Sequence, residues 1–243
     1  MSQITPTILY EDQHLLVINK PAGLVVHSDG RTTEATLSDW VKEKYPELKD
    51  IGGLHTLDSG RYVERWGIVH RLDRDTSGVL LIAKDAQTFL DLQRQFLERK
   101  IEKTYHAVVR GSLENDHGRI DMPIGRNRAD FRQWAIAPHA RGTLRSAITD
   151  YAVLGEYDKY SFLELSPKTG RTHQLRVHLS ALGHSIAADT RYGGTKASAC
   201  GFKRLALHAR RIAFLYAGKK MEVTAPYPTD FESAAPLFGV SLG

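Results

Sequence analysis

The sequence predicts an α+β fold, in which a mostly antiparallel mixed sheet is flanked by a few helices. This prediction rests on many short apolar runs separated by turn residues, and on only three longer stretches with apolar residues at helical spacing. The 243 residues, of which 42% are hydrophobic, are enough for a substantial core. Because we find no internal repeat and no Pro- or Ser-rich linker, we expect a single domain over residues 1–243.

Short runs of apolar or β-branched residues are predicted to be strands. Turn residues such as Pro21 and Gly23 separate the first runs, and the run at 79–83 is apolar throughout, as in a buried strand. In chain order, the predicted strands lie at residues 8–10, 15–18, 24–26, 79–83, 105–109, 148–154, 162–165, 206–208, 212–215 and 221–224.

Three stretches are predicted to be helices, at residues 34–45, 86–99 and 172–182. Pro46 follows the first helix, Asp85 is a candidate N-cap of the second, and Gly183 is placed to cap the end of the third. The stretch at 49–66 contains three glycines and residues of mixed polarity, which predicts a loop.

Positive charge is concentrated in two stretches of the chain. The net charge is +5, but residues 123–145 hold five arginines against one acid (+4), and residues 165–188 hold three cations and no acid (+3). Concentrated positive charge suits a surface that binds a polyanion. The alternative is a pair of solvated loops.

Several classes of site are excluded by what the sequence lacks. Cys200 is the only cysteine, so the chain has neither an internal disulfide nor a Cys-based zinc cluster. His173 and His178 do not share a helix face and there is no HExxH pattern, so we expect no bound metal. No apolar run approaches the roughly 20 residues that cross a bilayer. Since the N-terminus also lacks the pattern of a signal peptide, we expect a cytoplasmic protein.

The densest polar stretch, residues 67–78, directly precedes the predicted buried strand. It contains His70-Arg71-Leu72-Asp73, and Asp73 is flanked by Arg71 and Arg74. Nearby cations favour the charged form of a carboxylate, so an ionised Asp73 can act as a nucleophile or a base. The alternative is a turn held together by Asp–Arg ion pairs.

A second dense stretch, residues 168–178, opens the third predicted helix. Backbone amides at a helix start, reinforced by Lys168 and Arg171, suit phosphate binding. Arg176 lies at the edge of the apolar stripe and requires an acidic partner, for which Asp73 is a candidate. The alternative is a basic helix face in solvent.

Together these stretches resemble pseudouridine synthases of the RluA type. The resemblance covers the chain from Ile8 to about Pro228, and six landmarks occur in the order of that family. They are Asn19 to His27, His70-Arg71-Leu72-Asp73 with Thr76-Ser77-Gly78, Lys103-Thr104-Tyr105, Thr169 to His178, Leu205 to Ala209, and Ala225-Pro226.

The resemblance implies a role for each matching residue. Asp73 matches the catalytic aspartate, and Arg71 matches the arginine that enters the RNA stack when the target uridine is flipped out. Tyr105, Arg176 and Leu207 match residues of the uracil pocket: a stacking tyrosine, an arginine that pairs with the catalytic carboxylate, and a residue that helps to enclose the base.

The resemblance also implies a central RNA-binding cleft and an RNA substrate, an rRNA or tRNA stem-loop, modified by a protein that we expect to be a monomer. Pseudouridine formation rejoins the uracil through C5 and adds or removes nothing, so we expect no cofactor. An ionised Asp73 can attack C1′, add to C6 of the base, or take a proton from C2′. The basic loop at about 123–147 is expected to contact RNA; the predicted RNA-binding residues are Arg126, Arg128, Arg132, Lys168 and Arg171.

The chain departs from the pattern of the family in one loop. Where the family has Gly-His-Pro-Ile and then Gly-Asp, this chain has Gly183-His184-Ser185-Ile186-Ala187-Ala188-Asp189. We also expect no S4-type RNA-binding domain, because only about seven residues precede the first predicted strand. The aromatic residues Phe131 and Trp134 can either stack on bases or pin the basic loop to the core.

Two rival functions remain open. A nucleoside or glycoside hydrolase could use Asp73 and Asp75 as paired carboxylates, because residues two apart on a strand face the same way. An RNA-binding module without catalysis would need only the basic surfaces.

Overall fold

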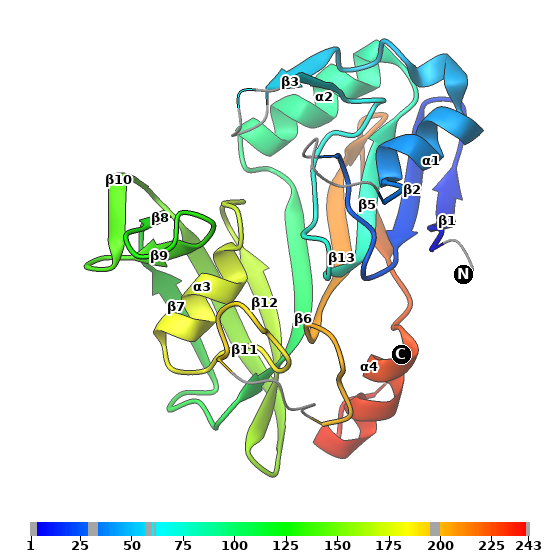
Figure 1. Cartoon of the computed structure of the whole chain (residues 1–243). Coiled ribbons are helices and arrows are strands. Elements are labelled where there is room, and N and C mark those ends of the chain that lie inside the picture. The colour runs from blue at the N-terminus through cyan, green and yellow to red at the C-terminus, as the bar shows by residue number, and fades with distance from the viewer. Residues whose placement is uncertain (1–3, 29–33, 57–59, 61, 195–199, 242–243) are drawn as a thin grey trace. The chain divides into compact units, whose positions relative to one another are not determined.

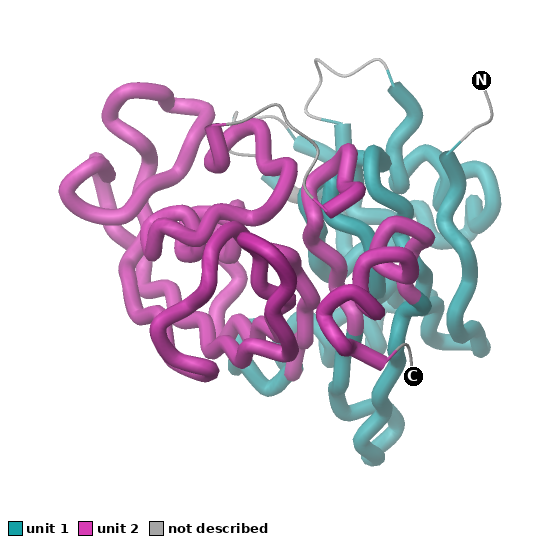
Figure 2. The backbone as a smooth tube through the Cα atoms, turned by 90° about the horizontal axis from the view of Figure 1, so that it is seen from below, with its two compact units in different colours: residues 1–101, 211–226 teal, residues 102–210, 227–243 magenta. Residues whose placement is uncertain are grey.

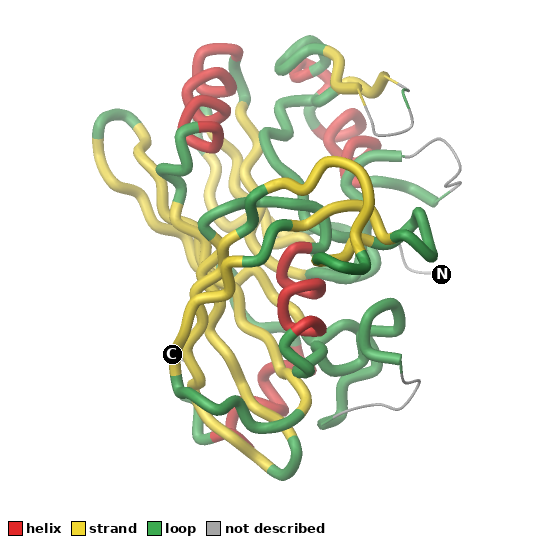
Figure 3. The backbone as a smooth tube through the Cα atoms, turned by 90° about the vertical axis from the view of Figure 1, so that its left-hand side faces the viewer, coloured by secondary structure: helices red, strands yellow, loops and turns green. Residues whose placement is uncertain are grey.

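The computed structural model describes residues 4–28, 34–56, 60, 62–194 and 200–241. The chain forms two compact units, which are coloured separately in Figure 2. Unit 1 comprises Met1–Ile101 and Arg211–Pro226, and unit 2 comprises Glu102–Arg210 and Tyr227–Gly243. Strands outweigh helices in both units (Figures 1 and 3). The predicted α+β class with a mostly antiparallel sheet is confirmed.

Unit 1 is built mainly from antiparallel strands and two helices. Its elements are β1 (Thr7–Glu11), β2 (Leu15–Lys20), α1 (Leu37–Lys44), a short 3-10 turn (Pro46–Leu48), β3 (Leu54–Thr56), β4 (Tyr62–Glu64), β5 (Ser77–Ala83), α2 (Ala86–Leu97) and β14 (Lys219–Thr224). Strand β2 pairs with β1 on one side and with β5 on the other. Every residue of β5 is buried, as its apolar sequence predicts. Strands β3 and β4 form a small hairpin inside the stretch that was predicted to be a loop.

Side-chain caps define where the two helices of unit 1 begin. Thr36 and Asp39 form a capping box, in which the Asp39 carboxylate accepts a hydrogen bond from the Thr36 amide at 2.9 Å. Helix α1 therefore begins three residues later than predicted. Asp85 caps α2 as predicted, accepting from the Thr88 amide at 2.8 Å. The strand predicted at residues 24–26 is not formed, because backbone carbonyls there accept hydrogen bonds from the first amides of α1.

Unit 2 contains a four-stranded antiparallel ladder and a separate small sheet. Its elements are β6 (Glu102–Arg110), β7 (His117–Asp121), β8 (Ile124–Asn127), β9 (Trp134–Ile136), β10 (Ala140–Arg145), β11 (Ile148–Tyr157), β12 (Tyr160–Pro167), α3 (Gln174–Ala181), β13 (Leu207–Tyr216, which continues into unit 1 and pairs there with β14), α4 (Thr229–Ala234) and a 3-10 turn (Ala235–Phe238). Strands β6, β12, β11 and β7 are neighbours in that order, and β8 lies between β10 and β9. The strands predicted at 206–208 and 212–215 are one continuous strand.

The core of unit 2 holds α3 in place. Leu175 and Leu179 of α3 are buried in the same apolar cluster as Phe162 of β12. The helix starts at Gln174, two residues later than predicted, because His173 adopts a left-handed conformation with φ of 56°. It ends before Gly183, whose φ of 86° is the left-handed geometry expected of a C-terminal cap.

Candidate active site and basic surface

The His-Arg-Leu-Asp segment lies in irregular backbone of unit 1 that leads into β5. Its start is set by Gly67, whose φ is 72° and whose carbonyl accepts from the Ala83 amide at 2.8 Å. A Cβ at this position would lie 2.1 Å from the Ala83 carbonyl oxygen, so only glycine fits. The segment is therefore held against the C-terminal end of β5.

Alternate residues of this segment are anchored to the protein. The His70 Nε2 atom accepts from the Leu81 amide at 3.0 Å, and its ring lies 4.7 Å from that of Phe96. Leu72 is buried. Arg71, between these two anchors, is exposed, and its guanidinium makes no hydrogen bond or ion pair with any residue that the structure describes. Asp73 is half-buried.

A buried lysine supports the backbone next to Asp73. Lys20, at the end of β2, is fully buried, and its Nζ donates to the carbonyls of Pro21, Leu24 and Arg74 at 2.8–3.0 Å. The Arg74 carbonyl, one of these three acceptors, belongs to the residue that directly follows Asp73. In the sequence, Lys20 is only part of the first landmark, although a lysine at the end of an apolar run is a signal that it has buried partners.

Two alternatives drawn from the sequence do not fit this geometry. Arg74 binds Glu34, with Nη2 at 2.7 Å from Oε2, and the Gly23 carbonyl, so it does not hold Asp73 in an ion pair. Asp73 and Asp75 do not share one face of a strand, because both precede β5 and Asp75 lies in a turn. Asp75 is also exposed, so the premise of a hydrolase with paired carboxylates was wrong.

Arg176 has a buried acidic partner, Asp189, that the sequence pattern did not predict. Its Nε and Nη2 atoms donate to the two carboxylate oxygens of Asp189, each at 2.8 Å. The Asp189 carboxylate is fully buried and also accepts from the Arg191 and Tyr192 amides. Burial raises the pKa of Asp189, but the hydrogen bonds and charge of Arg176, with the two amides, outweigh burial and lower it. Asp189 thus fixes the Arg176 side chain at the start of α3.

The loop that departs from the family pattern keeps the backbone shape that a glycine would favour. Ala188 has a φ of 56°, which is left-handed, at the position where the family has the glycine that precedes the aspartate. This conformation costs a residue with a Cβ about 1–2 kcal/mol. Asp189 is nevertheless placed to bind Arg176, so the loop accommodates alanine in this left-handed conformation.

The predicted site residues are distributed over both units. Asp73 and Arg71 belong to unit 1, whereas Tyr105, Arg176 and Leu207 belong to unit 2. Within unit 2, Leu207 at the start of β13 is buried in the core, and the half-buried Tyr105 of β6 packs against the same apolar cluster.

The basic stretch forms the small sheet β10-β8-β9 of unit 2. Trp134 packs against the small apolar cluster that contains Val177, and the Arg126 guanidinium lies 4.2 Å from the centre of its ring. Phe131, at the turn between β8 and β9, is 63% exposed. Trp134 therefore pins the sheet to the core, and Phe131 alone of the two remains available for stacking.

Some of the predicted RNA-binding cations already have acidic partners. Arg132 binds Asp130, with Nε 2.9 Å from Oδ1, and this contact lowers the pKa of Asp130 to about 2. Lys168 lies 3.3 Å from Asp150. By contrast, Arg128 uses its Nε to bind the Ala140 carbonyl, which leaves its positive charge uncompensated by any described acid.

The start of α3 is partly capped from within. The Gln174 side chain accepts from the Arg171 amide at 3.0 Å and from the Thr169 hydroxyl at 2.7 Å, and the Arg171 Nε binds the Ser146 carbonyl. The Arg171 amide is therefore already used, so fewer amides are available to an anion than the sequence predicted.

Within the described ranges, no group of three or more His, Cys, Asp or Glu residues is placed to hold a metal ion. None of the helices in the described part of the chain has the length and apolar character that crossing a membrane requires.

Comparison with known proteins identifies the family to which this chain belongs. The family model described as RNA pseudouridylate synthase matches residues 14–181. An uncharacterised RNA pseudouridine synthase of Aquifex aeolicus is 42% identical over 188 residues, which cover 76% of this chain and 55% of the relative. The ribosomal large subunit pseudouridine synthase D of Zymomonas mobilis is 37% identical over 245 residues, covering 96% and 73% of the two chains.

Among solved structures, human RNA pseudouridylate synthase domain containing 1 is similar to this chain with a TM-score of 0.72 and 30% identity, covering 98% of this chain and 89% of that chain. The chain thus belongs to the RNA pseudouridylate synthase family. It spans about half the length of the Aquifex relative.

Proposed function

We propose that this protein is an RNA pseudouridine synthase, an isomerase that converts specific uridines of structured RNA to pseudouridine. The observation that carries the proposal is the construction of the His-Arg-Leu-Asp segment. His70 and Leu72 are anchored, while Arg71 is exposed and Asp73 is only half-buried. A segment built in this way holds a cation and a carboxylate where a ligand can reach them.

In the proposed mechanism, the Asp73 carboxylate reacts with the target uridine. It attacks C1′, adds to C6 of the base, or takes a proton from C2′; each route ends with the uracil joined through C5. The target uridine must leave the RNA stack before it reacts, and Arg71 fills the space that it leaves. The exposure of Arg71 supports this role.

Residues of unit 2 are proposed to hold the uracil. The half-buried ring of Tyr105 stacks on the base, and Leu207 contributes an apolar wall. The charge of Arg176 stabilises the catalytic carboxylate. Two of its nitrogens bind Asp189, which fixes the orientation of the guanidinium within unit 2.

The RNA substrate is proposed to be large-subunit rRNA, which the name of the Zymomonas relative supports; a tRNA stem-loop is the alternative. Arg126, Arg128, Arg132, Lys168 and Arg171 would contact its phosphates. We further infer that the protein acts as a cytoplasmic monomer, which light scattering of the purified protein would test.

The central test replaces Asp73 by Asn and follows tritium release from RNA labelled at C5 of uridine, prepared from cells that lack the gene. We expect the Asp73→Asn variant to release no tritium while it still binds the RNA. The matched control Asp75→Asn should remain active, since Asp75 is a neighbouring but exposed carboxylate. Turnover by Asp73→Asn would refute the proposed nucleophile, and release of free uracil by the wild type would indicate a hydrolase.

A further inference from the structure

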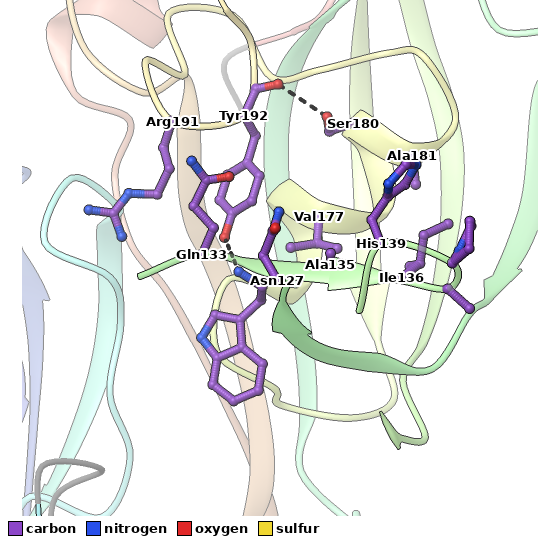
Figure 4. Close-up of a pocket in the computed structure, with 13 residues that line it drawn as sticks. Asn127, Gln133, Ala135, Ile136, His139, Val177, Ser180, Ala181, Arg191 and Tyr192 are labelled. Carbon is purple, nitrogen blue, oxygen red and sulfur yellow. Dashed lines mark hydrogen bonds between the residues drawn. The ribbon is translucent and has the colours of Figure 1, made fainter. Parts of the chain in front are cut away.

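A pocket of about 480 Å³ lies in unit 2, between the small sheet β10-β8-β9 and α3 (Figure 4). This volume falls in the range of pockets that bind small organic groups. Asn127, Gln133 and Tyr192 lie on one side of the pocket in Figure 4, and Ala181 and His139 lie on the other. None of the residues that line it belongs to the proposed catalytic site or to the predicted phosphate contacts.

The apolar part of the pocket is held rigidly. Val177 of α3 is buried in the small cluster against which Ile136 and Tyr192 pack. The Tyr192 hydroxyl accepts from the Trp134 amide at 3.1 Å and lies 2.8 Å from His173 Nδ1. A fixed aromatic ring beside aliphatic side chains is the kind of wall against which a planar base packs.

The polar side chains of the pocket have unused hydrogen-bonding groups. The side-chain amide of Gln133 and the imidazole of His139 make no hydrogen bond with any residue in the described ranges. Asn127 uses its Oδ1 to accept from the Ala129 amide at 2.7 Å, and among the described residues its Nδ2 has no acceptor. A primary amide offers a donor and an acceptor side by side, which matches the edge of a nucleobase.

Positive charge surrounds the same pocket. Arg191 lines it and donates to the Arg132 carbonyl at 3.2 Å, which ties the pocket rim to the turn that carries the exposed Phe131. Arg126 and Arg128 lie on the adjoining strand end and turn. A neutral metabolite would gain little from these cations, whereas a nucleotide within a polynucleotide carries a phosphate on each side.

We propose that this pocket binds an unpaired nucleobase of the RNA substrate, a second nucleotide distinct from the target uridine. The inference rests on the proposed function, because it requires the substrate to be RNA. Such a contact would let the protein recognise a loop rather than a continuous duplex, since only an unpaired base can leave the helix to enter a pocket. The Arg176 guanidinium lies 5.1 Å from the centre of the Tyr192 ring, so the pocket adjoins a residue of the proposed uracil site.

The test measures binding of labelled single-stranded octanucleotides, namely oligouridylate, oligoadenylate and an abasic ribose-phosphate chain. The variants are Gln133→Ala and Asn127→Asp. Aspartate keeps the oxygen that caps the Ala129 amide, so it removes the Asn127 donor without losing the turn. Gln87→Ala on α2, an exposed amide that does not line the pocket, is the control, and Arg128→Ala reports on phosphate contact alone.

We expect Gln133→Ala to weaken the binding of at least one base-bearing octamer by about tenfold, the size of one good base contact, without changing the binding of the abasic chain. Asn127→Asp adds a negative charge that weakens the binding of all three chains, so its loss should be larger for that octamer than for the abasic chain. Gln87→Ala should bind like the wild type. Arg128→Ala should weaken the binding of all octamers and make the slope of log binding constant against log salt concentration less steep by about 0.7.

An equal loss of affinity for base-bearing and abasic chains, or no loss of affinity with either pocket variant, would overturn the proposal that this pocket binds a nucleobase. The binding assay does not depend on turnover, so it gives an answer even if isomerisation fails. Conversely, tritium release by the wild type with unchanged binding by the pocket variants would leave the proposed function standing and remove only the pocket.

Discussion

Replacement of Lys20 by Met tests whether the buried lysine positions the proposed catalytic segment. Methionine has a similar length and fills the same space, so the change removes mainly the ammonium group. The carbonyls of Pro21, Leu24 and Arg74 then lose a donor that lies 2.8–3.0 Å away. Since the Arg74 carbonyl follows Asp73 directly, the backbone that carries the proposed nucleophile loses a fixed contact.

The size of the effect follows from these three hydrogen bonds. A hydrogen bond to a charged group contributes about 1.5–3 kcal/mol, and part of the total is offset because the ammonium is no longer desolvated. We therefore expect the free energy of unfolding to fall by about 3 kcal/mol. A displacement of a reacting group by about 1 Å can lower the rate by about 100-fold, so kcat should fall by that order.

Urea denaturation measures the first effect, and tritium release under single-turnover conditions measures the second. Lys84→Met is the matched control. Lys84 is also mostly buried, and its Nζ binds Glu11 at 2.9 Å and the Asp12 carbonyl at 2.7 Å, but it follows β5 whereas Asp73 precedes it. This variant should lose stability and keep its kcat. A Lys20→Met variant with the wild-type kcat, or an equal loss of kcat in Lys84→Met, would refute the positioning role.

Three further predictions concern unit 2. Asp189→Asn should lower the free energy of unfolding at pH 7 by about 3–5 kcal/mol, because it leaves Arg176 buried without its charge partner. The pKa of Asp189 is lowered in the folded protein, so the difference in free energy of unfolding between the wild type and Asp189→Asn should shrink as the pH falls below about 4, the pKa of an Asp in the unfolded chain. A difference that stays constant with pH in urea titrations would contradict this prediction. Ala188→Gly should raise the stability by about 0.5–1 kcal/mol, because glycine adopts the left-handed conformation without strain, and a lower urea midpoint would show that the loop is not strained. Burial lowers the pKa of His178, so stability should fall as the pH drops from about 6.5, and this part of the pH dependence should be absent in His178→Gln.

Local rules let the sequence predict several features of the fold correctly. Asp85 caps the helix that begins at the next residue, and Gly183 follows the end of α3, so each signal lies beside the structure that it defines. The apolar run at residues 79–83 also predicted correctly that β5 is a buried strand. Strand β10 of the basic stretch was missed because it is almost wholly exposed, and an exposed strand lacks the alternation of apolar residues that identifies strands.

The sequence by itself determined the fold class, the order of the landmarks and the position of Asp73 before a buried strand. Only the tertiary structure decided which partner each charged side chain binds. Lys20 binds the Arg74 carbonyl, 54 residues away in sequence; Arg74 binds Glu34, 40 residues away; and Arg176 binds Asp189, 13 residues away. Capping and turn preferences act over three or four residues and can be read along the chain. The partner of a buried charge is whichever group the packing brings within hydrogen-bond distance, and no local pattern specifies it.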